Sequence, residues 1–81
     1  MLEIDKQELS DLLQSSLQRL NSRTAFVIRQ HFGLEGSRYS LDKLARDLGV
    51  SKKRICRIEE GGLRHLSEGR RGRSLMDFLE G

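Results

Sequence analysis

Residues 40–66 decide the fold, and they read SLDKLARDLGVSKKRICRIEEGGLRHL. Counted from Leu41, the fifth position is the small Ala45 and the ninth is Gly49. A small residue lets a second helix approach closely, and glycine allows the tight turn between two helices. Apolar residues fall where the two helices must touch: Leu44, Leu48, Val50, Ile55 and Ile58. This spacing predicts a helix-turn-helix with a projecting second helix, and an ordinary helical hairpin is the alternative.

Helical periodicity also extends upstream of this stretch. Five leucines recur at helical spacing, so we expect an amphipathic helix over about residues 5–20. Asn21 offers a break and a new N-cap, and a second apolar pattern follows over about residues 23–32. Gly33 is a natural terminator for that second helix.

The helix-turn-helix has its own start and stop signals. Ser40 and Ser51 are the expected N-caps of its two helices, and Gly49 is expected to end the first of them. The pair Gly61-Gly62 weakens the second helix by about 1 kcal/mol per glycine relative to alanine, so we expect a kink or fraying there. After it, Leu75, Phe78 and Leu79 predict a short helical arm that folds back on the core.

Length and composition bound the architecture. A chain of 81 residues with 36% apolar residues has room for one small core. We expect one all-α domain of four to five helices over residues 1–81. The helix-turn-helix occupies residues 40–66, and a basic C-terminal arm occupies residues 67–81.

The positive charge is unevenly distributed. Up to Val50 the chain carries seven basic and seven acidic residues, whereas Ser51 to Arg73 holds eight basic and three acidic residues. Such a surplus favours a polyanionic partner, because neutralising phosphates releases counterions. A solvated helix face is the plainer interpretation.

Several function classes find no support in the sequence. Cys56 is the single cysteine, and with His31 and His65 it lacks the paired spacing of a zinc site. We expect neither metal nor cofactor. No catalytic triad or phosphate-cradling glycine loop is present, so we expect no enzyme. No apolar run approaches the ~20 residues that span a bilayer and no signal segment is evident, which favours the cytoplasm.

Most of the sequence resembles a known family. Residues 23–34 (RTAFVIRQHFGL), residues 39–59 and residues 63–66 are similar to region 4 of sigma-70-family bacterial transcription initiation factors. The resemblance covers nearly the whole chain and implies a sigma region 4 or winged-helix-like fold. It implies binding to the minus-35 promoter element, docking on the flap of the RNA polymerase β subunit, and a nucleoid-associated location in the bacterial cytoplasm.

The resemblance also implies roles for particular residues. It makes Lys52, Lys53, Cys56 and Arg57 the readers of base edges. The expected contacts to DNA phosphates are Arg23, His31, Ser40, Leu41, Ser51, Arg54 and Arg71. Arg64 resembles a position that meets transcription activators, although a phosphate or solvent contact is equally compatible with it.

The reading positions depart from the family pattern. Typical primary factors carry arginine, glutamate, arginine and glutamine where this chain has Lys52, Lys53, Cys56 and Arg57, and commonly arginine at His31. The missing glutamate removes an acceptor for the cytosine amino group, whereas Arg57 is suited to guanine O6 and N7. We therefore expect either an altered promoter preference or weak base readout dominated by backbone contacts.

Three functional hypotheses remain at this stage. The first is a monomeric sigma region 4 module, either acting alone or cut from a longer factor. The second is a protein-interaction module that binds the polymerase flap, an anti-sigma factor or an activator with little DNA specificity. The third is a stand-alone repressor, which would dimerise to read two half-sites.

Overall fold

The computed structural model describes residues 5–80, which form five helices and no strand. The helices are α1 (Lys6–Gln18), α2 (Ser22–His31), α3 (Leu41–Leu48), α4 (Lys52–Ser67) and α5 (Gly72–Glu80). The predicted all-α class is confirmed, and α3 and α4 form the expected helix-turn-helix. Residues 1–4 and 81, at the ends of the expected domain, lie outside the described part of the chain.

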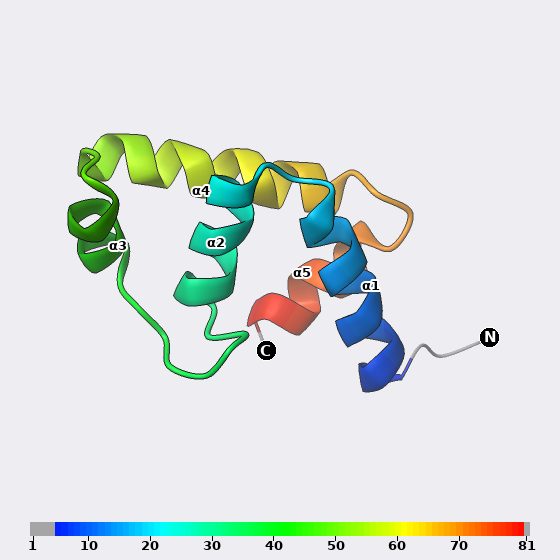
Figure 1. The fold of residues 1–81 in the computed structure, drawn as a ribbon. Helices are drawn as coiled ribbons and strands as arrows, with labels where there is room; N and C mark the ends of the chain where they lie inside the picture. The colour runs from blue at the N-terminus through cyan, green and yellow to red at the C-terminus, as the bar shows by residue number, and fades with distance from the viewer. Residues whose placement is uncertain (1–4, 81) are drawn as a thin grey trace.

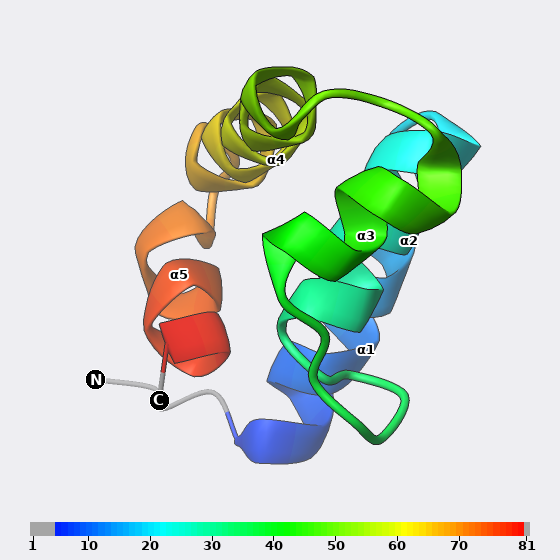
Figure 2. The ribbon, with the colours of Figure 1, turned by 90° about the vertical axis from the view of Figure 1, so that its left-hand side faces the viewer.

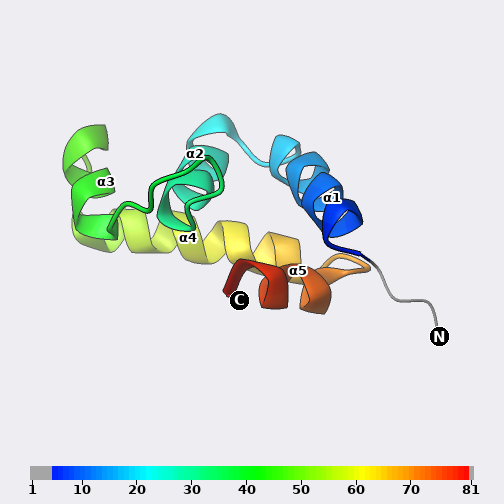
Figure 3. The same cartoon turned by 90° about the horizontal axis from the view of Figure 1, so that it is seen from below.

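The longest helix, α4, organises the molecule. In Figure 1 it runs along one side, with α3 at its N-terminal end, α2 beneath its middle, and α1 and α5 towards its C-terminal end. Viewed from below, α3 and α1 lie at opposite ends of the molecule (Figure 3). Viewed nearly along α4, α3 lies in front of α2 (Figure 2). The domain is correspondingly elongated, at 45 × 24 × 18 Å.

Side-chain caps set the helix starts. Asp5 and Asn21 accept hydrogen bonds from the backbone N–H three residues on, at 2.7 Å and 2.8 Å. Ser40 and Ser51 do the same for α3 and α4, both at 3.1 Å. Each such cap contributes about 1 kcal/mol relative to alanine. The predicted caps at positions 21, 40 and 51 are thereby confirmed.

Buried side chains form two clusters that α2 joins. The first lies between α1, α2, α5 and the C-terminal end of α4, and consists of Leu13, Leu17, Ala25, Ile28, Leu66, Leu75 and Leu79. The second lies inside the helix-turn-helix and consists of Val27, Leu44, Ala45 and Ile55. Because successive faces of α2 serve the two clusters, the helix-turn-helix is fixed to the rest of the domain. The expected C-terminal arm contains α5, which supplies two leucines to the first cluster.

The expectation of a weak point at Gly61-Gly62 is wrong. Helix α4 runs without interruption from Lys52 to Ser67. Gly62 is buried, and a Cβ atom there would lie 2.5 Å from Ile28 Cδ1 and 2.6 Å from Thr24 Cγ2. The missing side chain therefore lets α2 pack directly against α4, and this packing outweighs the low helix propensity of glycine.

Candidate nucleic-acid interface

The first two turns of α4 present an exposed cationic face. Lys52, Lys53, Arg54 and Arg57 are exposed, and Cys56 is half-buried beside them. Positions 53, 56 and 57 lie one turn apart and so share a face. The N-terminal end of a helix carries partial positive charge, which adds to that of the side chains. The four expected base readers are therefore gathered on one accessible turn-and-a-half of helix.

The opposite side of the same helix is anchored. Ile55 is 0% exposed and packs with Leu44, Ala45 and Val27. The turn leading into α4 is made tight by Gly49, whose φ of 70° is the left-handed conformation that glycine adopts without steric cost. Val50 N–H donates to Ala45 O at 2.9 Å across this turn. The predicted turn is confirmed, and its packing aims the cationic face away from the core.

Lys52 already has a partner within the protein. Its Nζ lies 3.3 Å from Asp42 Oδ1 of α3, and both side chains are well exposed. Surface ion pairs of this kind contribute about 0–1 kcal/mol, so DNA phosphate or a base can displace the carboxylate. Among the four expected readers, Lys53 and Arg57 are the strongly charged ones without a carboxylate partner in residues 5–80.

Five of the expected phosphate contacts lie at the starts of helices. Ser40 and Ser51 cap α3 and α4, and the half-buried Leu41 and exposed Arg54 follow in the first turns of these helices. Backbone N–H groups at such helix starts are natural anion donors. Arg23 is exposed in the first turn of α2.

Arg71 and Arg64 lie apart from these helix starts. Arg71 is exposed in the turn between α4 and α5. Arg64, the expected activator contact, is exposed on the last turns of α4 and lines a shallow groove with Leu63 and Met76. Both positions are therefore accessible to a partner.

His31 has partners other than those expected. Its Nδ1 lies 3.1 Å from the Tyr39 carbonyl oxygen, and its Nε2 lies 3.3 Å from Glu59 Oε2 of α4. Both ring nitrogens are thus occupied inside the protein, between α2, α4 and the loop that precedes α3. The structure gives this half-buried residue a bridging position, and its expected phosphate contact stays a prediction.

Within residues 5–80 no cluster of histidine, cysteine, aspartate and glutamate side chains is arranged to hold a metal ion. No helix in the described part of the chain is long and apolar enough to cross a membrane.

Comparison with known families decides the assignment. The family model for sigma-70, region 4 matches residues 16–68, which include α2, α3 and α4. The chain belongs to the sigma-70 region 4 family. Members of this family are helix-turn-helix DNA-binding regions of proteins that act in transcription initiation, and they are not enzymes.

Individual relatives agree with this membership. The chain is 38% identical over 79 residues to RNA polymerase sigma factor SigA of Listeria monocytogenes, covering 96% of this chain and 20% of that protein. It is 32% identical over 78 residues to RNA polymerase sigma factor RpoD of Helicobacter pylori, covering 94% and 12% respectively. RNA polymerase sigma-C factor of Nostoc sp. is 37% identical over 76 residues, with 93% and 18% covered. The chain therefore spans a fifth or less of the length of these relatives.

Glu59 is a residue of this sigma region 4 domain whose role the sequence did not reveal. Its ion-pair partner is His31 of α2, not a residue of its own helix. Its Oε2 atom is buried and has no hydrogen-bond partner within residues 5–80, although His31 Nε2 lies 3.3 Å away. Burial raises the pKa of the Glu59 carboxyl above its ordinary value of 4.5; the nearby His31 acts against this rise, and Glu60 adds to it.

This raised pKa predicts a particular pH dependence. The folded state holds the Glu59 proton more tightly than the unfolded chain does. The protonated Glu59 carboxyl therefore contributes to stability at low pH, and this contribution declines as the pH rises from about 4.5 through the raised pKa. In Glu59→Gln this decline should disappear, and the free energy of unfolding of wild type minus that of the variant should fall with pH. Urea unfolding between pH 4 and pH 7 measures it. Glu68→Gln, which alters an exposed carboxyl, is the control, and a pH-independent difference for Glu59→Gln would contradict the assignment.

Proposed function

We propose that this chain binds promoter DNA sequence-specifically at the minus-35 element, as the region 4 module of a sigma factor that supports transcription initiation. The observation that carries the proposal is the exposed cationic face on the first two turns of α4, held outward by the buried Ile55. Family membership supports it independently. The module works with RNA polymerase in the bacterial cytoplasm, and in a longer factor other regions would melt the start site.

The side chains on α4 have different roles in DNA recognition because their chemistry differs. Arg57 has a planar guanidinium that matches guanine O6 and N7, and Lys53 is the second charged reader. Cys56 is half-buried and offers a small, weakly polar surface to the groove. Lys52 reaches the groove when its ion pair with Asp42 opens. None of the four is a carboxylate, so this set does not read a cytosine amino group.

Phosphate contacts fix the register of the module on the duplex. Arg23 and Arg54 are exposed at the starts of α2 and α4. The helix N-termini at Ser40, Leu41 and Ser51 offer backbone N–H groups. Contacts of this type orient the protein without selecting bases.

Two substitutions distinguish a residue that reads bases from one that contacts phosphate. Arg57→Ala is expected to change the base preferred at one position and to cost about 1–3 kcal/mol on the preferred sequence. Arg71→Ala is expected to weaken all sequences alike and to reduce the salt dependence of binding by about one phosphate contact. Selection of enriched sequences from a randomised duplex pool with each variant measures both. Uniform weakening by both substitutions would contradict the reading role of Arg57.

A second face of the domain suits the polymerase. Partly buried apolar side chains surround the first core cluster and leave apolar surface at its edge: Phe32, Leu34, Leu63, Met76 and Phe78. Leu63 and Met76 line a groove of about 400 Å³ together with Arg64. The flap of the RNA polymerase β subunit docks on this face, and an activator meets the adjacent Arg64.

A protein-interaction module with little DNA specificity is the second candidate. Two observations favour it: Lys52 is paired with Asp42, and Cys56 is half-buried where a strong base reader would be exposed. On this alternative the apolar face binds the flap, an anti-sigma factor or an activator, and α4 supplies only sequence-independent attraction. The absence of any enriched sequence, with tight binding to the flap, would favour it.

A further inference from the structure

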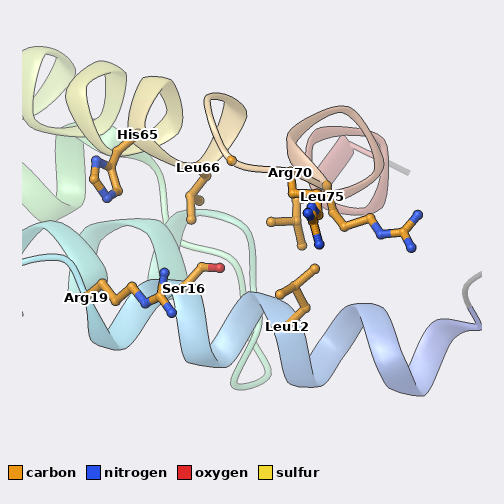
Figure 4. A pocket seen from close by; sticks show the side chains of 9 residues that line it. Leu12, Ser16, Arg19, His65, Leu66, Arg70 and Leu75 are labelled. Carbon is orange, nitrogen blue, oxygen red and sulfur yellow. The ribbon is translucent and has the colours of Figure 1, made fainter.

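A cleft lies at the opposite end of α4 from the readers. It has a volume of about 430 Å³ and lies between α1, the C-terminal end of α4 and the turn into α5. Figure 4 shows Ser16 on α1 and Arg19 at its C-cap facing His65 and Leu66 on α4, with Arg70 where the chain leaves α4. Arg71 completes the basic part of the lining.

The cleft is strongly cationic. Three arginines and a histidine line it, all four are exposed, and no acidic residue is among the lining residues. Within residues 5–80 none of Arg19, Arg70 and Arg71 forms an ion pair with a carboxylate, although four other ion pairs are present there. Uncompensated cations gathered in one concave site favour an anionic occupant.

The cleft adjoins a second hollow that reaches the recognition face. A neighbouring hollow of about 340 Å³ lies between the α1–α2 corner and α4, and His65 lines both. Arg57, Gly61 and His65 line this second hollow at successive turns of α4, which places them on one side of the helix. His65 lies eight positions after Arg57, a rise of about 12 Å along the helix. Gly61, midway between them, has no side chain and leaves this surface open.

We propose that this cleft holds the phosphodiester backbone of the same DNA duplex, beyond the base pairs that α4 reads. The inference rests on the proposed DNA-binding function and extends its footprint. Arg19, Arg70 and Arg71 contact phosphates there, and His65 bridges the cleft to the readers. In this arrangement α1, which lies outside the helix-turn-helix, supplies one of the DNA contacts.

The lining favours a phosphate backbone over an acidic peptide. A peptide helix needs apolar anchors as well as charges, yet Leu66 and Leu75 on the cleft floor are only 2% and 3% exposed. Half-buried Leu12 is the remaining leucine of the lining. The accessible polar groups are mainly guanidinium N–H donors, which match phosphate oxygens in a bidentate manner.

The test compares duplexes of different length. Three duplexes carry the sequence selected by the wild-type chain: a short one with minimal flanks, and two extended by ten base pairs on one side or the other. The wild-type chain is expected to bind one extended duplex more tightly than the short one. The slope of log K against log salt should be steeper by about 0.9 for each added phosphate contact.

Two double variants, each lacking two positive charges, show which residues cause the higher affinity for the extended duplex. Arg19→Gln/Arg70→Gln, which leaves the phosphate contact Arg71 in place, should abolish the advantage of the extended duplex while keeping the affinity for the short one within about twofold. Lys6→Gln/Arg73→Gln removes the same charge from exposed residues outside the cleft lining and should keep the advantage. Circular dichroism and thermal melting verify that both variants fold.

The outcomes separate this inference from the proposed function. No binding to any duplex contradicts the proposed function and the inference together. Two results would overturn the inference alone. In the first, the chain binds the short duplex but gains no affinity on either extended duplex. In the second, both double variants lose the gain in affinity equally. If polyglutamate binds the chain, Arg19→Gln/Arg70→Gln abolishes that binding, and extended DNA gives no gain, the cleft is assigned to acidic polypeptides and the inference is also overturned.

Discussion

Replacing Ile55 by alanine is expected to lower the free energy of unfolding by about 2–5 kcal/mol. Ile55 is 0% exposed, and its cluster has only three other buried members: Val27, Leu44 and Ala45. The neighbouring helices are joined by a tight turn, so they cannot close over the space that the lost methyl groups leave. Urea unfolding followed by circular dichroism measures the change.

The conservative variant serves as the control for this prediction. Ile55→Val removes one methylene and is expected to cost about 0.5–1.5 kcal/mol. Because the second cluster aims the cationic face, Ile55→Ala should also weaken DNA binding at temperatures where it is still folded. If Ile55→Ala and Ile55→Val were equally stable, the description of this cluster as close-packed would be wrong.

The second large effect is expected at Gly72, the first residue of α5. A Cβ atom there would overlap with the carbonyl oxygen and the carbonyl carbon of Ser67. These are backbone atoms at the end of α4, so relief requires the two helices to separate. Gly72→Ala is therefore expected to destabilise the domain by about 1–3 kcal/mol, towards the upper end because no side chain can yield.

Gly69 offers a matched control in the same turn. A Cβ atom at Gly69 would make an ordinary contact of 3.7 Å with Leu66 O, and the residue is exposed. Gly69→Ala is expected to stay within about 0.5 kcal/mol of wild type in the same unfolding experiment. Equal stability of the two variants would show that α5 does not dock as closely as the structure places it.

Features set by neighbouring residues were predictable from the sequence. The caps at Ser40 and Ser51 and the left-handed Gly49 follow from local chemistry that acts within one turn. The shared face of Lys53 and Arg57 follows from helical spacing alone. These local signals were sufficient to predict the helix-turn-helix and its exposed cationic face.

Features set by helix crossings were not predictable. The continuity of α4 through Gly62 depends on how closely α2 approaches, which no local propensity reveals. The ion pair between His31 and Glu59 joins residues 28 positions apart, and it exists because α2 crosses α4 at that level. The cleft that Arg19 shares with Arg71 likewise arises only when α1 and the α4–α5 turn meet.

The most direct test of the central claim is selection from a duplex pool with a randomised hexamer, at fixed salt. It is run with this chain alone and with the chain fused to a helix of the polymerase flap. The account predicts one enriched, asymmetric hexamer in at least one format, bound by a monomer, with guanine at the position that Arg57 reads. No enrichment in either format would contradict promoter readout, and an enriched palindrome bound by a dimer would indicate a repressor-like protein instead.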